Sequence, residues 1–156
     1  MTVAAVADTG PLIHLAEIDS LELLSAFDRL YIPETVHAEL EAGGVPLALS
    51  EVEYELVELS ERRSHFPELD AGETSALTVA IEQGADLLTD DLDAREVAME
   101  DGVEVHGSVG VIALGYARGL LERDEAAARM RALQRETSLF VTDGVIERGI
   151  RMLEGT

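Results

Sequence analysis

The first indication of the fold is the segment Val3-Ala4-Ala5-Val6-Ala7-Asp8-Thr9-Gly10-Pro11. The residues before Asp8 form a short, unbroken apolar run, which is typical of a strand buried on both faces of a sheet. The turn residues that follow the acid, with Pro11 among them, indicate the start of a helix. We therefore predict a buried strand over 3–7 that leads directly into a helix, with Asp8 at its carboxyl end.

The rest of the chain continues this alternation of strands and helices. Strands are expected at 30–32, 52–59, 85–89 and 103–106, and helices at 12–27 (two short helices divided near Asp19-Ser20), 33–43, 74–83, from Asp90-Asp91 to about 100, 107–116, 123–135 and 143–153. Alternating strands and helices indicate an α/β fold with a parallel sheet. Without repeats or linkers, the chain is expected to form one domain over 1–156, with the helix at about 143–153 packing on it or on a partner.

Composition narrows the class of protein. The 156 residues fit one domain, at about 100–200 residues per domain. The absence of Cys excludes a disulfide scaffold, a Cys-ligated metal site and thiol catalysis. No stretch approaches the ~20 apolar residues of a membrane span, and no basic region precedes Asp8 as in a signal peptide. We therefore expect a cytoplasmic protein without a membrane segment.

The net charge is unusually negative. Asp and Glu number 32 against 11 basic residues, which gives −21, and all the basic residues are Arg. A small soluble domain usually carries a charge of magnitude about 2–8. Self-repulsion on this scale destabilises a compact state in dilute buffer, whereas at ~1 M salt the Debye length falls to about 3 Å and screens most of it. The composition favours a halophilic host over an acidic mesophilic protein.

The charge also bears on partners. A nucleic-acid-binding protein normally shows a basic stripe, and none is visible here. That argument weakens in concentrated salt, where phosphate contacts are weak for any protein.

Four acidic positions fall where an α/β sheet would bring them together. Asp8 and the pair Asp90-Asp91 follow predicted strands, and ligands of an open parallel sheet bind outside the carboxyl ends of its strands. Glu39 and Glu73 lie on predicted helices beside them. Each also has a purely structural interpretation: Asp8, Asp90 or Asp91 as a helix cap, Glu73 as a helix-dipole residue and Glu39 as a solvated side chain.

Together these acids indicate a metal site. Two carboxylates about 4 Å apart repel by roughly 4 kcal/mol at an effective dielectric of 20, so a converging set needs a divalent cation or protonation. Oxygen ligands without His or Cys favour Mg²⁺ or Mn²⁺ over zinc, as one ion or two.

The motifs around these acids resemble those of PIN domains, in order along most of the chain. The matching segments are Val6-Ala7-Asp8-Thr9-Gly10-Pro11-Leu12-Ile13, Ile32-Pro33-Glu34-Thr35-Val36-His37-Ala38-Glu39-Leu40, Gly72-Glu73-Thr74-Ser75-Ala76-Leu77 and Leu87-Leu88-Thr89-Asp90-Asp91. The Gly-Glu third motif resembles a PIN-like subfamily related to VapC-type toxins. The resemblance implies a three-layer α/β/α fold with a mostly parallel sheet, and a metal-dependent endoribonuclease.

The resemblance also implies roles for individual residues. Asp8, Glu39, Glu73 and Asp91 would form the catalytic acidic quartet that binds Mg²⁺ or Mn²⁺, with Asp90 and Asp93 as further candidate ligands. Thr9 and Thr89 would be supporting hydroxyls. Two features depart from the family pattern: Glu73 replaces the more frequent Asp, and basic residues around the groove are sparse, with Arg95 the nearest candidate for substrate binding.

The remaining motifs give little indication of function. The four His residues (14, 37, 65 and 106) lack metal-ligand spacing, so no zinc site is predicted. His14 falls in an apolar helix and is expected to be a packed core residue. Gly107-Ser108 lacks both the P-loop and the dinucleotide pattern and is interpreted as a helix entry capped by Ser108.

The sequence therefore predicts an endoribonuclease that hydrolyses RNA phosphodiester bonds, as the toxin of a toxin–antitoxin pair, with a small antitoxin protein and a second copy of the chain as partners. The alternatives are a catalytically weak PIN-like module that binds nucleic acid or protein, and an RNA-processing nuclease outside toxin–antitoxin systems.

The salt dependence is directly testable. We expect the chain to refold in multimolar KCl and to lose stability at low KCl, because the repulsion among its carboxylates is then unscreened. Circular dichroism after refolding at both salt concentrations measures this, and stability indifferent to KCl would contradict a halophilic origin.

Overall fold

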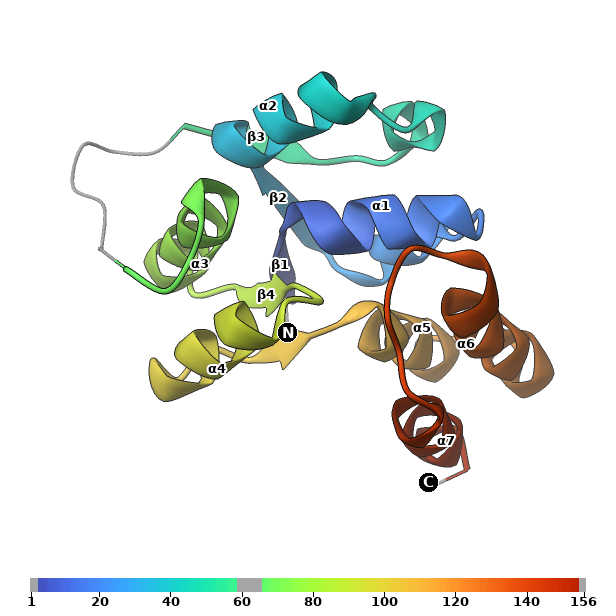
Figure 1. The fold of residues 1–156 in the computed structure, drawn as a ribbon. Coiled ribbons are helices and arrows are strands. Elements are labelled where there is room, and N and C mark those ends of the chain that lie inside the picture. Colours follow the sequence, from blue (N-terminus) through green and yellow to red (C-terminus); the bar gives the residue numbers. More distant parts are fainter. Residues whose placement is uncertain (1–2, 59–65, 155–156) are drawn as a thin grey trace.

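The computed structural model describes residues 3–58 and 66–154 and shows a sheet of five parallel strands among them (Figure 1). Its spatial order is β3-β2-β1-β4-β5. The strands are β1 (Ala4–Ala7), β2 (Arg29–Pro33), β3 (Glu55–Val57), β4 (Asp86–Leu88) and β5 (Val105–His106). The strand formed by the opening apolar run, β1, lies at the centre of the sheet and is largely buried, as predicted.

Helices connect the strands and cover the sheet. They are α1 (Thr9–Glu17), α2 (Glu34–Gly43), α3 (Ala71–Gln83), α4 (Leu92–Glu100), α5 (Ser108–Ala117), α6 (Arg123–Glu136) and α7 (Asp143–Met152), with two 3₁₀ helices, η1 (Leu21–Ala26) and η2 (Leu47–Glu51). None of the described helices is long and apolar enough to cross a membrane.

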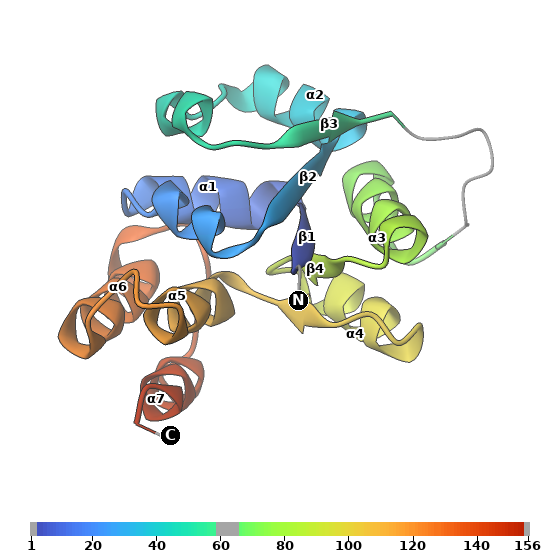
Figure 2. The ribbon, with the colours of Figure 1, turned by 180° about the vertical axis from the view of Figure 1, so that it is seen from behind.

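Two apolar cores lie on opposite faces of the sheet. Ala5 and Ala7 of β1 contribute to the core shared with α1, α2 and α5, whereas Val6 between them points to the core shared with α3 and α4. Figures 1 and 2 show α3 and α4 on one side of the sheet and α1 and α5 on the other. The predicted three-layer α/β/α arrangement with a parallel sheet is confirmed.

The order of the strands determines where a ligand crevice forms. The chain runs outward from β1 to β2 and β3 on one side, then returns to place β4 and β5 on the other. The loops that leave β1 and β4 therefore diverge to opposite faces, and ligands of such sheets bind at this switch point, outside the carboxyl ends of the strands.

The predicted elements are present, with several differences in extent. The second short helix of 12–27 is the 3₁₀ helix η1, and η2 was not predicted. Helix α3 begins at Ala71 rather than Thr74, because Asp70 caps it. The strand predicted over 52–59 is paired only over Glu55–Val57, at the edge of the sheet, and its last residue lies outside the described residues.

Helix α7 packs against α5 and α6 through a glycine. A Cβ atom at Gly149 would lie 2.6 Å from Val109 Cγ1 and 3.0 Å from Met130 Sδ, so the close approach of the helices depends on its absence. Gly144, in the same helix, meets only Thr142 Oγ1, at 3.9 Å.

These two glycines give a matched pair of variants. Gly144→Ala is expected to raise the free energy of unfolding by up to about 1 kcal/mol, because Ala favours a helix over Gly. Gly149→Ala is expected to lower it by about 1–3 kcal/mol, because the added methyl overpacks the contact with Val109, whose side chain is stiff. Urea unfolding in concentrated KCl measures both, and a stabilising Gly149→Ala would contradict this packing.

Candidate metal and nucleic-acid site

A cavity of about 290 Å³, here called the acidic cavity, opens at the carboxyl ends of β1 and β4. Carboxylates dominate its lining, which consists of Asp8, Thr9, Gly10, His14, Glu39, Asp70, Glu73, Asp90, Asp91 and Leu139. The structure therefore brings the four predicted acids to one place, although they are far apart in the sequence.

Asp8 is the buried member of this group, with 6% of its surface exposed. Its Oδ1 accepts a hydrogen bond from the Thr9 backbone N at 2.8 Å, and its Oδ2 accepts one from Thr89 Oγ1 at 2.9 Å. Burial raises the pKa of Asp8 to about 6; the two hydrogen bonds oppose this rise, and the nearby Asp70 and Glu39 charges add to it. The protein thus holds a carboxylate that would be more stable with a cation beside it.

Glu39 reaches the cavity from α2. Its Oε2 accepts a hydrogen bond from Thr9 Oγ1 at 2.8 Å. A Cβ atom at Gly72 would lie 2.6 Å from both carboxylate oxygens of Glu39, so the carboxylate rests against the backbone at the start of α3. Gly72 therefore makes room for Glu39 directly beside Glu73.

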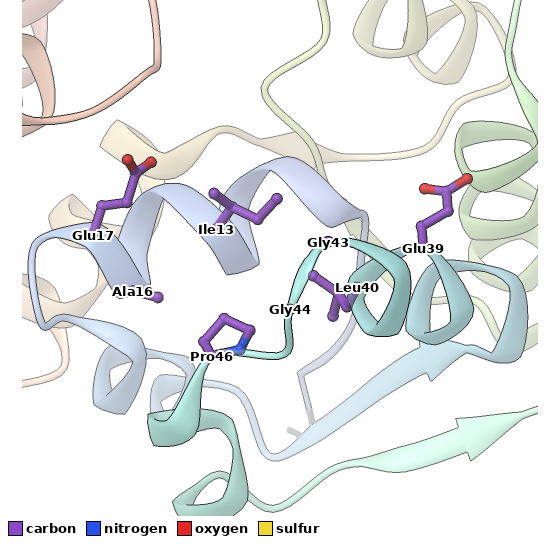
Figure 3. Close-up of a pocket in the computed structure, with 8 residues that line it drawn as sticks. All are labelled: Ile13, Ala16, Glu17, Glu39, Leu40, Gly43, Gly44 and Pro46. Carbon is purple, nitrogen blue, oxygen red and sulfur yellow. The ribbon is translucent and has the colours of Figure 1, made fainter.

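Glu39 also borders a second hollow, of about 280 Å³, between α1 and the end of α2. Figure 3 shows the side chains of Glu17 and Glu39 at its two ends, with Ile13, Leu40 and Pro46 between them. This groove is largely apolar, so the carboxylate of Glu39 marks the boundary between it and the acidic cavity.

Glu73 forms a reciprocal capping box with Asp70 at the start of α3. The Glu73 backbone N donates to Asp70 Oδ1 at 2.8 Å, and the Asp70 backbone N donates to Glu73 Oε1 at 3.4 Å. Its other oxygen, Oε2, is buried and has no hydrogen-bond partner among the described residues. The capping box accounts for Oε1 but leaves Oε2 unexplained.

Burial and neighbouring charge act on Glu73 in the same direction. Loss of solvent and then the Asp70 carboxylate raise its pKa to about 8, with Asp91 and Asp8 adding to the rise; only the hydrogen bond from the Asp70 backbone opposes it. The unpartnered Oε2 and these acidic neighbours fit a hard divalent cation, whose charge and oxygen preference would satisfy both.

The two acids in the loop after β4, Asp90 and Asp91, make different contacts. Asp91 caps α4, accepting from the Ala94 N at 2.9 Å, and its own N donates to Thr89 Oγ1 at 3.2 Å. Asp90 binds Ser108 through the backbone N at 2.6 Å and the hydroxyl at 2.5 Å, and binds His14 Nδ1 at 2.8 Å. Both oxygens of Asp90 are thereby engaged, which leaves Asp91 the better placed of the two to accept a further ligand.

Two predictions about neighbouring residues are wrong. His14 is not a packed core residue: it lies beside the acidic cavity and binds Asp90, one helical turn after Gly10, which lines the same cavity. Ser108 does not cap α5; Gly107 takes the N-cap position, and Ser108, the first helical residue, donates to Asp90.

Two predicted site residues lie outside the acidic cavity, and one acid that lines it was not predicted. Asp93 is exposed on α4 and does not line the acidic cavity, whereas Arg95 lines a neighbouring cavity that shares Asp90. Asp70 was missed, although Asp70-Ala71-Gly72-Glu73 carries the spacing of a capping box.

A second group of potential metal ligands comes from β4, β5 and the residue that precedes β5. Among the described residues, one trio of His, Asp and Glu brings its ligand atoms within 4.8 Å of one another: Asp86, Glu104 and His106, with His106 Nε2 at 3.1 Å from Asp86 Oδ2. This trio could hold a metal ion. Among the described residues, no three acids of the acidic cavity bring their ligand atoms as close together as this trio does.

The comparisons with known proteins identify the family. The model of the family DUF3368, described as a PIN domain, matches residues 4–154. The chain belongs to the PIN-domain family. No curated protein matches this PIN domain.

A solved structure shares the fold. It is a PilT N-terminus domain protein from the hyperthermophilic archaeon Sulfolobus solfataricus P2, with a TM-score of 0.62 and 20% identity, over 77% of this chain and 97% of that one. PIN domains are generally nucleases that bind nucleic acid and a divalent metal ion, so the family agrees with a nuclease-like class and with the chemistry of the acidic cavity.

The raised pKa of Asp8 predicts how stability depends on pH without added metal. Its pKa is 3.8 in the unfolded chain and about 6 in the folded one, so its contribution to stability is full below pH 4 and is lost as the pH rises through 6. At pH 8 with a chelator, Asp8→Asn is expected to raise the free energy of unfolding by up to about 3 kcal/mol, at 1.36 kcal/mol per pKa unit.

The control is Asp101→Asn, which removes one exposed carboxylate outside the cavity. Urea unfolding at pH 4 and pH 8 measures both variants. If Asp8→Asn gains no more stability at pH 8 than Asp101→Asn does, burial of the Asp8 charge is not costly and this account of the site is wrong.

Proposed function

We propose that this PIN domain is a Mg²⁺- or Mn²⁺-dependent endoribonuclease whose catalytic residues are Asp8, Glu39, Glu73 and Asp91. The observation that carries the proposal is Glu73 Oε2, a buried carboxylate oxygen to which no described residue donates a hydrogen bond. Glu73 lines the same cavity as Asp8 and Asp91. A nuclease-like family supports the reaction class.

In this proposal the chain's own residues have distinct tasks. Asp8, Glu73 and Asp91 would hold one or two ions, and Glu39 would hold an ion or orient the attacking water. A bound Mg²⁺ or Mn²⁺ supplies Lewis-acid stabilisation of an in-line displacement at phosphorus. Hydrolysis would leave a 5′-phosphate and a 3′-hydroxyl.

The two threonines position these acids. Thr89 donates to Asp8 Oδ2 and accepts from the Asp91 backbone, so its single hydroxyl sets the spacing between the two strand ends. Thr9 donates to Glu39 Oε2 and draws α2 toward the same cavity. Asp90 and His14 brace the loop after β4 from the other side.

The finer biological role rests on the order of the four acidic motifs. We propose that the chain is the toxin of a toxin–antitoxin pair in the cytoplasm of a halophilic prokaryote and acts as a homodimer. A small antitoxin protein would be its physiological inhibitor.

The decisive test is cleavage of a labelled RNA pool in concentrated KCl with Mn²⁺ or Mg²⁺. The parent is expected to cleave only with the divalent ion, and Asp8→Asn to lower the rate about 100-fold or more, because a neutral amide cannot hold the cation as a carboxylate does. Asp101→Asn, with the same change in charge outside the cavity, is expected to cleave like the parent. Cleavage by Asp8→Asn at the parental rate would overturn the assignment.

A further inference from the structure

A second cavity, here called the side groove, opens next to the acidic cavity. It has a volume of about 420 Å³ and lies between α4, β5, α5, α7 and the segment that precedes α7. Asp90 and Leu139 line both cavities, so the two adjoin each other. Its volume falls within the range of about 300–1,000 Å³ that small-molecule sites occupy.

The side groove combines apolar walls with two guanidinium groups. Val105, Val109 and Val141 contribute to the walls, and Arg95 and Arg148 also line the groove. Neither Arg forms an ion pair within the part of the chain that the structure describes. Asp90 also lines the side groove, but both of its oxygens accept hydrogen bonds from Ser108 or His14. In a chain of net charge −21, two cations that form no ion pair with the described carboxylates point to an anionic ligand.

The position of Arg95 depends on a glycine. A Cβ atom at Gly107 would lie 2.7 Å from Arg95 Nη1 and 2.9 Å from Asp90 Oδ1. The guanidinium group therefore lies over the backbone at the entrance to α5, at the boundary between the acidic cavity and the side groove.

The rim of the side groove carries large apolar side chains exposed to solvent. Phe140 is 92% exposed, Leu92 79% and Met152 53%. Exposed apolar groups of this size beside a cavity mark binding sites, and an exposed aromatic ring offers a face on which a nucleobase can stack.

We propose that the side groove holds the nucleotide next to the scissile phosphate of a single-stranded RNA, with Arg95 and Arg148 on its phosphates and its base against Phe140. This inference rests on the proposed function, because a strand cleaved at the acidic cavity must continue into an adjoining surface. A base that packs against Phe140 must be unpaired, so the subsite is tested with single-stranded RNA and with duplex RNA as its comparison.

The test measures RNA binding without cleavage. Anisotropy of a fluorescent single-stranded RNA is recorded with Asp8→Asn as the parent, in a chelator, over a series of KCl concentrations at which the chain stays folded. Phe140→Ala is expected to weaken binding about fivefold or more, because stacking contributes ~1–3 kcal/mol per base. The Phe140→Ala variant should show the same salt dependence of binding as its Asp8→Asn parent. Its affinity for the duplex form of the RNA should also equal that of the parent.

The two arginines are tested through the salt dependence of RNA binding. The double variant Arg95→Gln/Arg148→Gln is expected to weaken binding and to reduce the slope of log affinity against log salt by about 1.4, at ~0.7 per phosphate contact of a single strand. The matched control Arg118→Gln/Arg151→Gln removes the same charge from exposed residues that do not line the groove. It is expected to retain the parental slope.

The outcomes separate this proposal from the proposed function. If the chain with Asp8 intact cleaves RNA but the groove variants bind like the control, the side groove is not a nucleotide site and the nuclease assignment stands. If the groove variants lose binding but the chain with Asp8 intact cleaves nothing with any divalent ion, the nucleotide site stands and the nuclease assignment fails. If no variant binds RNA and a protein partner covers Phe140 instead, the proposal is overturned.

Discussion

The structure depends on one electrostatic constraint: a carboxylate is buried at the end of the central strand among other carboxylates. Asp8 lies at the centre of the sheet because β1 does, and its low exposure raises its pKa. Two hydrogen bonds, from the Thr9 backbone and the Thr89 hydroxyl, offset only part of that cost. A cation beside Asp8 would offset the remaining cost. The pKa of Glu73 is raised as well, so a cation would also stabilise the charged form of Glu73.

The two adjacent acids in the loop after β4 have different roles: the contacts of Asp90 are structural, whereas Asp91 is free to bind a further ligand. Both oxygens of Asp90 accept hydrogen bonds from Ser108 or His14, so Asp90 links the last turn of α1 to the start of α5. Asp91 caps α4 with one oxygen only. The same loop leads from the acidic cavity to Arg95 and the side groove, so anionic and cationic surfaces meet within a few residues. That proximity suits a polyanion held by Arg and cleaved at acids that a cation neutralises.

The elements with a strong local signal were predictable. The apolar run before Asp8 and the helix over 123–135 needed no tertiary information, because burial on both faces and helical periodicity are written in neighbouring residues. The edge strand β3 was predicted too long, since its ends depend on pairing with β2 rather than on local pattern. The start of α3 was missed because the Asp70–Glu73 box was not recognised, although its spacing is local.

The α/β class, the burial of the first strand, the resemblance to PIN domains and the candidate acids were all predictable from the sequence. They were predictable because periodicity, turn residues and motif order are recorded in neighbouring positions. Three features became visible only in the folded structure. Asp90 binds Ser108 and His14, Glu73 keeps a buried oxygen with no partner among the described residues, and Arg95 and Phe140 line one groove. These features depend on contacts between residues far apart in the chain. Packing, which no local pattern records, determines the distances between them.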